Sequence, residues 1–428
     1  MKIKRLYTSN YKNLVRCTIE PTGILALTGC NGSGKSNLLE VPEFVALIIS
    51  GSDEAKDTIF KYGSSPLGGS WCPFVKTKEE VFPFVFELDA IILVGDREWE
   101  VDYLLEVKCP EFIEPYKYKG VGEITKETVK IKEMNKSGQK KTILNRIGNE
   151  THVFFETSRK KLAFRTKSDM SAFQALEVRE ADDYPIDFPV FSELHRALTA
   201  FNLIKLNPEK LLIAASHQYT SPFERRPGST IDFFPMYSLL QEIKKDPSNW
   251  NSLMEWLKRL CNIDHINFYE KEPDHSPQTD ESKQDEYKIA SSRYIFVYQQ
   301  DRVLWPEELS TGCAMLLGLL VAIHSFLPLS GAVILEEPET YLHPKAIIDL
   351  ITLLREVSEY NTVIFSTHSP VTLNSMTPSE VTLMQVIENG FVTTRNVSEI
   401  KEAIDTLNRG YISFGDLLQS NFTVDSCH

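Results

Sequence analysis

The chain has 428 residues, enough for two or three domains or for one large α/β domain with insertions. Its charged and hydrophobic fractions, 25% and 42%, are typical of a soluble globular protein, and its formal net charge of −13 argues against a protein that coats nucleic acid with its whole surface. The seven cysteines form no C-x-x-C pair, which predicts reduced thiols in a cytosolic protein.

A strand–loop–helix unit near the start of the chain carries the strongest chemical signal. Residues 24–28 are apolar and predict a buried strand, and the run from Asn37 onward predicts a helix. Between them lies a complete G-x-x-x-x-G-K-[ST] phosphate loop, Gly29-Cys30-Asn31-Gly32-Ser33-Gly34-Lys35-Ser36. Backbone N–H groups of such a loop converge on phosphate oxygens at a helix N-terminus, where anions are favoured.

Each part of this loop has an expected partner in a bound nucleotide. Lys35 should reach the β- and γ-phosphates, and the Ser36 hydroxyl should bind Mg²⁺. The rest of the loop should hold phosphate oxygens through Asn31, Gly32, Ser33 and Gly34. The alternative, a glycine-rich turn without function, is disfavoured by the flanking strand and helix.

The stretch from 81 to 167 predicts an antiparallel β layer, with strand-like runs at 85–88, 100–104 and 153–156 and a hairpin turn at 135–138. Residues 121–170 contain twelve Lys or Arg and six Asp or Glu, against a net-acidic remainder. This region is therefore either a phosphate-binding surface or the solvated face of a β meander. We favour the solvated face, because no stacking aromatic residues are clearly interleaved.

The next stretch, from about 190 to 262, predicts helices. Six large apolar residues at helical spacing predict a buried helix face rather than a partner groove, and they are Trp250, Leu253, Met254, Trp256, Leu257 and Leu260. Residues 271–286 are polar and mostly acidic, which predicts a flexible surface loop.

A second anion-binding helix start is expected at Glu308-Leu309-Ser310-Thr311-Gly312. The apolar run that follows, from residue 314 to 329, predicts a buried helix. It contains His324 and is too short to cross a bilayer comfortably, so no membrane partner is expected.

Residues 332–335 predict a strand that ends in two carboxylates, Glu336 and Glu337. This is a Walker B pattern, in which a strand beside the phosphate-loop strand presents acids to Mg²⁺ and the γ-phosphate. Glu336 is the expected second Mg²⁺ ligand with Ser36, and Glu337 the expected general base. The alternative is a strand that ends in a solvated acidic turn.

A further strand, 363–366, leads to His368, which could bond a γ-phosphate and sense its loss. A lone histidine is more often structural than functional. Its order and spacing after the Walker B pattern favour the functional interpretation here. Residues 381–385 and 391–394 predict a strand pair, and 397–407 a helix.

Together these motifs resemble the ABC-type ATPase head shared by the SMC, RecF and OLD families. Gly29 to Ser36 resembles Walker A, Leu309 to Gly312 the signature motif, Leu335 to Glu339 Walker B, and Thr367 to Pro370 the switch histidine. The run from Asn10 to Leu14 also resembles the strand-turn that precedes Walker A in those families. The resemblance covers residues 1–50 and about 300–420.

The resemblance implies an α/β P-loop NTPase with a parallel-sheet core, an antiparallel β layer and a helical insertion. The expected divisions are an ATPase core at 1–70 and 300–428, a β insertion at 71–188 and a helical insertion at 189–299. It also implies ATP and Mg²⁺ as cofactors, with hydrolysis to ADP and phosphate. Ser310 and Gly312 of one subunit would close on the ATP held by Lys35 of its partner, in a homodimer or larger homo-oligomer.

Three departures from the family pattern concern turnover more than nucleotide binding. Cys313 follows the signature glycine where an acidic or amide residue is usual, and Glu336 replaces the usual Asp. No convincing Q-loop glutamine follows the first helix.

Only 60 residues follow His368, too few for the TOPRIM domain of OLD nucleases, so a nuclease-like effector would be a separate chain.

Heads of this size, with a β insertion and no coiled coil, look like the ATPase subunits of bacterial anti-phage systems such as PARIS and Septu. By that analogy, nucleotide-driven dimerisation controls a partner effector. One alternative is a RecF-like DNA-repair ATPase, because DNA remains a candidate partner for the Lys/Arg-rich region. The other is a nucleotide-gated scaffold with little turnover.

Overall fold

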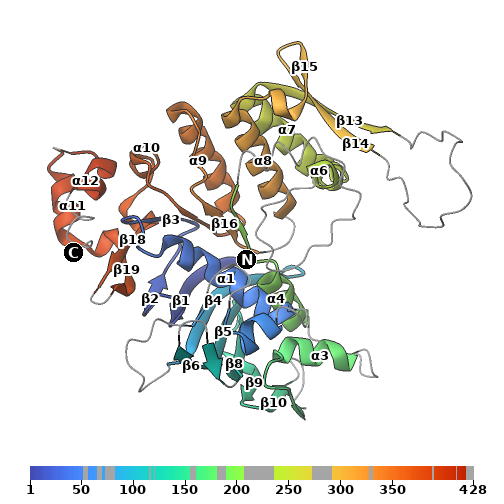
Figure 1. Ribbon diagram of the computed structural model, residues 1–428, viewed down its shortest axis with the longest axis vertical. Coiled ribbons are helices and arrows are strands. Elements are labelled where there is room, and N and C mark those ends of the chain that lie inside the picture. The colour runs from blue at the N-terminus through green and yellow to red at the C-terminus, as the bar shows by residue number, and fades with distance from the viewer. Residues whose placement is uncertain are drawn as a thin grey trace, which may run out of the picture.

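A computed structural model describes residues 1–51, 56–64, 70–72, 82–114, 117–119, 121–154, 161–180, 189–206, 236–271, 292–326, 331–387, 390–410 and 412–420. These residues include two large β-sheets, with helices between the sheets and on the far side of the second sheet (Figure 1). Among the described residues, no helix combines the length and apolarity needed to cross a membrane.

The first sheet is antiparallel and has the strand order β11-β10-β9-β8-β5-β4-β1-β2. Its strands are β1 (Lys2–Ser9), β2 (Cys17–Ile19), β4 (Phe84–Val94), β5 (Arg97–Lys108), β8 (Glu123–Glu133), β9 (Lys141–Ile147), β10 (Glu150–Phe154) and β11 (Lys161–Arg165). Along β4, Phe86 and Leu88 are buried while Glu87 and Asp89 are half-exposed, the alternation of a sheet with one face in the core. The predicted antiparallel layer is confirmed, and the turn at 135–138 joins β8 to β9.

The second sheet contains the predicted motif strands. Its order is β12-β16-β17-β3-β18-β19, formed by β3 (Ile24–Thr28), β12 (Asn202–Ile204), β16 (Val333–Glu336), β17 (Val363–Ser366), β18 (Val381–Val386) and β19 (Val392–Asn396). All neighbours pair in parallel except β18 and β19. The phosphate-loop strand was predicted to lie beside the Walker B strand, and this is wrong. The strand that leads to His368, β17, is inserted between them and pairs with both.

A second correction concerns β12, which lies in a stretch that was predicted to be helical. This strand has only three residues, too few to show a period of two, and it follows a strongly amphipathic helix. Pairing with β16 determines its conformation, because Leu203 lies opposite Ile334 in the parallel register. The described remainder of that stretch is helical, as predicted.

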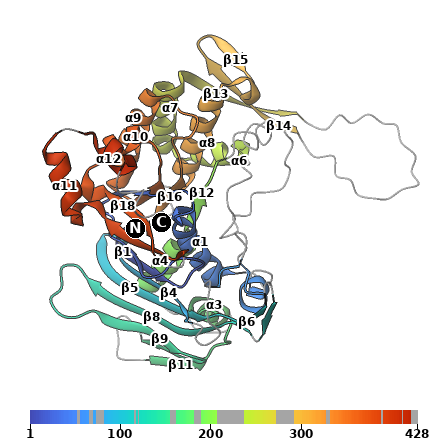
Figure 2. The ribbon, with the colours of Figure 1, turned by 60° about the vertical axis from the view of Figure 1, so that its left-hand side comes forward.

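The longer helices are α1 (Lys35–Ser50), α3 (Ala172–Glu180), α4 (Pro189–Thr199), α6 (Met236–Lys244), α7 (Pro247–Cys261), α8 (Thr311–Phe326), α9 (Pro344–Ser358), α10 (Pro370–Asn374), α11 (Lys401–Asn408) and α12 (Phe414–Ser420). Shorter helical turns cover Asp57–Lys61, Pro306–Glu308, Pro378–Glu380 and Val397–Glu399. Figure 2 shows α1 and α4 between the two sheets. Helix α9 packs on the other face of the second sheet, and α8 packs on α6 and α7.

The second sheet is covered on both faces and divides the interior into two cores. In β3, Leu25 and Leu27 belong to the core shared with α1 and the antiparallel sheet, whereas Ile24 and Ala26 face the core of α6 to α9. A strand buried on both faces reads as a continuous apolar run, which is why residues 24–28 were recognisable. The apolar residues of α7 also pack in this second core, as predicted, with Leu253 and Leu257 fully buried.

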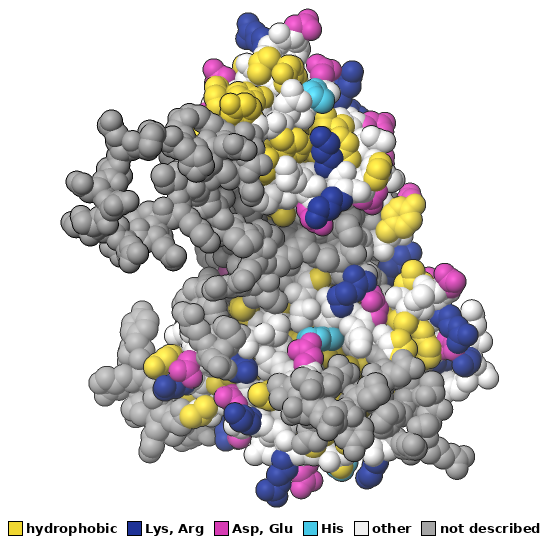
Figure 3. All heavy atoms as spheres, turned by 90° about the vertical axis from the view of Figure 1, so that its right-hand side faces the viewer, with side chains coloured by type: hydrophobic (Ala, Val, Ile, Leu, Met, Phe, Trp, Pro, Cys, Tyr) yellow, Lys and Arg dark blue, Asp and Glu magenta, His cyan; other side chains and the backbone are white. Residues whose placement is uncertain are grey.

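A three-stranded sheet extends from α7 and α8 at the top of Figure 1. It consists of β13 (Ile263–Lys271), β14 (Ser292–Gln299) and β15 (Arg302–Leu304), while β6 (Glu111–Glu114) and β7 (Lys117–Lys119) form a separate hairpin. Hydrophobic side chains gather at this upper end in Figure 3. In or next to these strands, Tyr269, Val303 and Trp305 are exposed. The predicted acidic loop lies outside the described residues except at Lys271.

The predicted fold class is therefore confirmed: an α/β fold with a parallel core sheet, an antiparallel β layer and an additional helical region. The exact divisions at residues 70, 188 and 299 stay a prediction. What matters for function is that β3, β12, β16 and β17 run in parallel. Their carboxyl ends therefore meet at one edge of the sheet, where ligands of such sheets bind.

Candidate functional site

The phosphate loop connects β3 to α1 in the conformation that its glycines permit. Gly32 and Gly34 have φ angles of +78° and +80°, in the left-handed region that side chains disfavour. At Gly29, an added Cβ would lie 2.7 Å from the carbonyl oxygen of Met384 and 2.8 Å from Ser33 Oγ. The backbone therefore approaches its neighbours too closely at this position for any other residue.

Lys35 begins α1 and is largely buried. Its amine donates hydrogen bonds to the carbonyl oxygens of Gly29, at 3.1 Å, and Cys30, at 2.9 Å, so it curls back over the loop. Burial lowers the pKa of Lys35, and the nearby carboxylates of Glu337 and Glu336 oppose that shift. The amine is thus positioned between the loop and the Walker B acids.

Ser36 and Glu336 lie in direct contact. The hydroxyl of Ser36 donates a short hydrogen bond to Glu336 Oε1, which joins the start of α1 to the end of β16. A hydroxyl beside a carboxylate is the donor set that nucleotide-bound Mg²⁺ takes from a protein, with phosphates and water completing the octahedron. The two residues therefore fit the ion that the sequence predicts. In the described part of the chain, no cluster of three or more His, Cys, Asp or Glu forms an independent metal site.

Glu337 and His368 face each other across the ends of β16 and β17. His368 Nε2 lies 3.8 Å from Glu337 Oε1, and the backbone N–H of Glu337 donates to Ser366 Oγ at 3.1 Å. The backbone of Glu337 is left-handed, with φ +43°, which turns the chain sharply after the strand. Burial lowers the pKa of His368, Lys35 lowers it further, and Glu337 opposes both effects. The net shift favours the neutral imidazole.

Sequence reasoning missed the role of Glu339, which ties the Walker B loop to the histidine loop. Thr367 Oγ1 donates a short hydrogen bond to Glu339 Oε1, and the N–H of Ser369 donates to Thr367 Oγ1 at 3.0 Å. Burial raises the pKa of Glu339. The Glu–Pro–Glu spacing could have signalled this residue, because it places a second acid directly after the turn at Glu337.

Lys205 was missed altogether. It follows β12, and its amine lies 2.7 Å from Glu336 Oε2 in an ion pair whose angles fall outside those of a hydrogen bond. No motif marks this lysine, and its strand was predicted to be a helix. Only the parallel pairing of β12 with β16 brings it beside the Walker B acid.

The predicted signature residues lie at a separate, exposed place. Ser310 precedes α8 and accepts a hydrogen bond from the N–H of Cys313 at 3.4 Å. A Cβ on Gly312 would lie 3.1 Å from the carbonyl oxygen of Tyr341, so this turn packs against the loop that follows Walker B. Within the part of the chain that the structure describes, no hydrogen bond joins Ser310 to the phosphate loop.

Residues 125–374 match the family described as "AAA domain, putative AbiEii toxin, Type IV TA system". The chain belongs to this AAA family. The matched span contains Ser310, Glu336, Glu337 and His368 and begins after the phosphate loop. No curated protein matches the sequence.

Three solved structures are also similar to this AAA chain. The SmcHead bound to the C-winged helix domain of ScpA shares 12% identity, with a TM-score of 0.45 over 94% of this chain and 100% of that one. The SMC head domain from Thermotoga maritima shares 13%, with a TM-score of 0.41 over 92% and 99%. The Smc head domain with an extended coiled coil, bound to the C-terminal domain of ScpA derived from Pyrococcus furiosus, shares 12%, with a TM-score of 0.37 over 95% and 99%.

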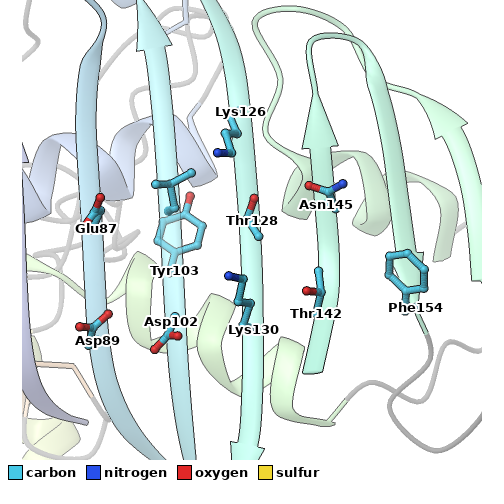
Figure 4. A pocket seen from close by; sticks show the side chains of 11 residues that line it. Glu87, Asp89, Asp102, Tyr103, Lys126, Thr128, Lys130, Thr142, Asn145 and Phe154 are labelled. Atoms are coloured by element: carbon cyan, nitrogen blue, oxygen red, sulfur yellow. The ribbon is translucent and has the colours of Figure 1, made fainter. Parts of the chain in front are cut away.

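The Lys/Arg-rich part of the AAA chain forms one side of a hollow of about 600 Å³ on the outer face of the antiparallel sheet. Figure 4 shows Lys126 and Lys130 on β8, with Asp102 on β5 and Asp89 on β4 beyond them. Asp102 is paired with Lys140, and burial together with Asp102 raises the pKa of Asp89. Acidic side chains on β4 and β5 lie beside basic side chains on β8, so the hollow offers no uniform phosphate-binding surface.

The expectation that every cysteine is a reduced thiol is wrong for one described residue. Cys30, in the phosphate loop, is disulfide-bonded, whereas Cys17, Cys72, Cys109, Cys261 and Cys313 are free. Spacing along the chain could not show this, because it does not reveal which sulfur atoms meet in the fold.

Proposed function

We propose that this protein binds Mg·ATP at the edge formed by β3, β12, β16 and β17 and hydrolyses it to ADP and phosphate. The observation that carries the proposal is the contact between Ser36 and Glu336, which joins the two predicted nucleotide motifs from opposite ends of the sequence. Lys35, Glu337 and His368 influence one another's charge around this contact. Bound Mg²⁺, held by Ser36 and Glu336, would neutralise charge on the transferred phosphoryl group.

The residues around that position have separate roles. Lys35 exchanges its two loop carbonyls for phosphate oxygens, which accept a stronger, charge-assisted hydrogen bond. Glu337 has a half-exposed carboxylate beside the γ-phosphate position and takes a proton from the attacking water. His368, whose lowered pKa favours the neutral imidazole, donates a hydrogen bond to the γ-phosphate and loses that partner after hydrolysis.

Nucleotide binding by Lys35→Ala tests this site. The variant should lose high-affinity Mg·ATP binding, measured by calorimetry, while its circular dichroism and melting temperature stay close to those of the parent protein. Lys245→Ala is the matched control, because Lys245 is a highly exposed lysine at the end of α6. This variant should bind ATP with the affinity of the parent protein. Unchanged ATP affinity in Lys35→Ala would refute the assignment.

We further propose that ATP joins two heads, with Ser310 of one subunit facing the phosphates held by the other. Support comes from the exposure of Ser310 and from the lack of a hydrogen bond between it and its own phosphate loop in the described residues. An interface between identical heads would then be isologous and contain two composite sites.

Mixed dimers test the composite site. Ser310→Arg should bind ATP as an isolated subunit but block closure of the heads and suppress hydrolysis. In a heterodimer with Lys35→Ala, one site carries both changes and the other carries neither, so some activity should return on mixing. Full activity of Ser310→Arg alone, or no recovery in demonstrated heterodimers, contradicts the arrangement.

We propose that the assembled ATPase controls a separate, nuclease-like effector in anti-phage defence. The toxin named in the description of the AAA family is consistent with a partner-controlled toxic activity. A TOPRIM or HNH nuclease encoded next to this protein, and co-purifying with it in an ATP-dependent manner, would support the proposal. Neighbouring frames without an effector, or a complex indifferent to Lys35→Ala, would contradict it.

A nucleotide-gated scaffold with little turnover is the second candidate, favoured by Glu336 in place of Asp. The longer side chain already reaches Ser36, so it alters the fit around the ion. ATP-dependent assembly without phosphate release would identify this function. A RecF-like DNA-binding role receives no support from the mixed charges around the described hollow. DNA binding that weakens steeply with salt would support the RecF-like role.

A further inference from the structure

Lys205 lies at the edge of the second sheet where the nucleotide is proposed to bind, and the surrounding sequence does not predict this position. Strand β12 pairs in parallel with the Walker B strand β16, with Ile204 opposite Leu335. The next residue on each strand is therefore Lys205 on one and Glu336 on the other. Figure 2 shows the short β12 beside β16 at the border of the second sheet.

The carboxylate of Glu336 has two different partners, one on each oxygen. Oε1 accepts the hydrogen bond from Ser36, and Oε2 lies 2.7 Å from the amine of Lys205. The three side chains thus form a chain from β12 through β16 to the start of α1. The Lys205 amine is separated from the predicted Mg²⁺ ligand Ser36 by a single carboxylate.

This ion pair is poorly suited to a purely stabilising role. The side chain of Lys205 is 55% exposed, and an ion pair with an exposed lysine contributes little to stability. The Glu336 side chain is only 12% exposed, so the lysine reaches inward from solvent to a largely buried acid. A long, flexible cation at this place can change partners without disturbing the packed core.

Binding of Mg·ATP changes the charges around Lys205. A divalent cation held by Ser36 and Glu336 would compete with the lysine for the same carboxylate. At the same time the terminal phosphate brings anionic oxygens to this edge of the sheet, where an ammonium group finds a stronger partner. Among the described residues, Lys205 forms the ion pair with Glu336, so its amine would lose this partner in the exchange.

We propose that Lys205 is a positioning residue that orients Glu336 toward Ser36 and then moves its amine to an oxygen of the terminal phosphate when Mg·ATP binds. This inference rests on the proposed ATP site. ADP has no terminal phosphate, so Lys205 makes the site prefer ATP over ADP. A contact that holds a charged phosphate oxygen corresponds to roughly tenfold or more in affinity.

The test compares the binding of AMP-PNP and ADP to the full-length protein by calorimetry, in Mg²⁺ and in EDTA. With Mg²⁺, Lys205→Met should weaken AMP-PNP binding about tenfold or more and ADP binding by less than about threefold. Lys205→Arg should restore most of the preference, because it returns the positive charge. Lys245→Met, on the exposed end of α6, is the matched control and should leave both affinities unchanged.

A wild-type ratio of AMP-PNP to ADP affinity in Lys205→Met would overturn the inference. An equal loss for both nucleotides would also overturn it, because Lys205 would then act only through Glu336. If the parent protein binds the nucleotides and Lys35→Ala does not, the ATP site is established, whatever the result for Lys205→Met. A parent protein that binds neither nucleotide would instead refute the proposed function and this inference together.

Discussion

Glu337→Gln should separate nucleotide binding from hydrolysis. The amide has the size of the carboxylate and keeps its hydrogen-bonding shape, but it cannot accept a proton from water. The backbone bond from Glu337 to Ser366 Oγ does not involve the side chain and remains. The left-handed φ of +43° is equally unfavourable for Gln and for Glu, so the turn should persist. The fold and the phosphate loop therefore stay intact.

The expected size of the effect follows from the role of the residue. General bases contribute about 10²- to 10⁴-fold to a rate. At about 1.36 kcal/mol per factor of ten, removing the base raises the barrier by roughly 3–5 kcal/mol. ATP affinity should change far less, because Lys35, Ser36 and Glu336 are untouched. The slow variant should therefore accumulate with ATP bound, as a dimer or larger assembly.

Single-turnover phosphate release measures the chemical step, and size-exclusion chromatography with bound-nucleotide analysis measures the trapped state. Glu359→Gln, an exposed acid at the end of α9, is the matched control and should turn over normally. Turnover of Glu337→Gln within about tenfold of the parent protein would show that Glu336 or another group positions the water. The general-base assignment would then be wrong.

Three further predictions concern charge and stability. In NMR titration the pKa of His368 should lie below 6.5, rise in Lys35→Ala and fall further in Glu337→Gln. Since the unfolded chain then binds the proton more tightly, this residue's contribution to stability should decrease as the pH falls through the window below 6.5; an unshifted pKa contradicts the geometry. A hydrogen bond from the Cys261 thiol is the chief cause that lowers the pKa of Cys313 to about 6, whereas burial raises the pKa of Cys17 to about 12. Cys313 should therefore be alkylated faster than Cys17 at pH 7, and Cys261→Ala should slow the alkylation of Cys313. Glu127→Ala should lower the free energy of unfolding by about 3–5 kcal/mol in urea, because the fully buried Arg146 keeps its backbone carbonyl acceptors but loses its carboxylate partner. Glu242→Ala, in an exposed ion pair, is the control, and an equal effect of both substitutions refutes the argument.

The sequence could predict the parts of the site that local rules determine. The phosphate loop needs glycines at fixed positions, and Gly29, Gly32 and Gly34 have the close approach or positive φ that those rules demand. The strands 24–28 and 363–366 were recognisable because both faces are buried, and the antiparallel layer because its residues alternate. These features depend on residues close together in the chain.

The parts that could not be predicted depend on pairing between distant segments. Lys205 acquires its place only because β12 pairs with β16, more than a hundred residues later in the chain. The insertion of β17 between β16 and β3 is likewise a choice among parallel neighbours that no local pattern specifies.

The loop after β16 connects every part of the proposed mechanism. Glu336 holds Ser36, Glu337 faces His368, and Glu339 binds Thr367 next to that histidine. A few residues later, the carbonyl of Tyr341 lies against Gly312 of the signature turn. A change at the terminal phosphate therefore has a continuous covalent path of six residues from the Walker B acid to the exposed surface that would meet a second head. These contacts hold the loop at both ends, so in the proposed mechanism hydrolysis would alter the position of Ser310 without rearranging the buried sheet.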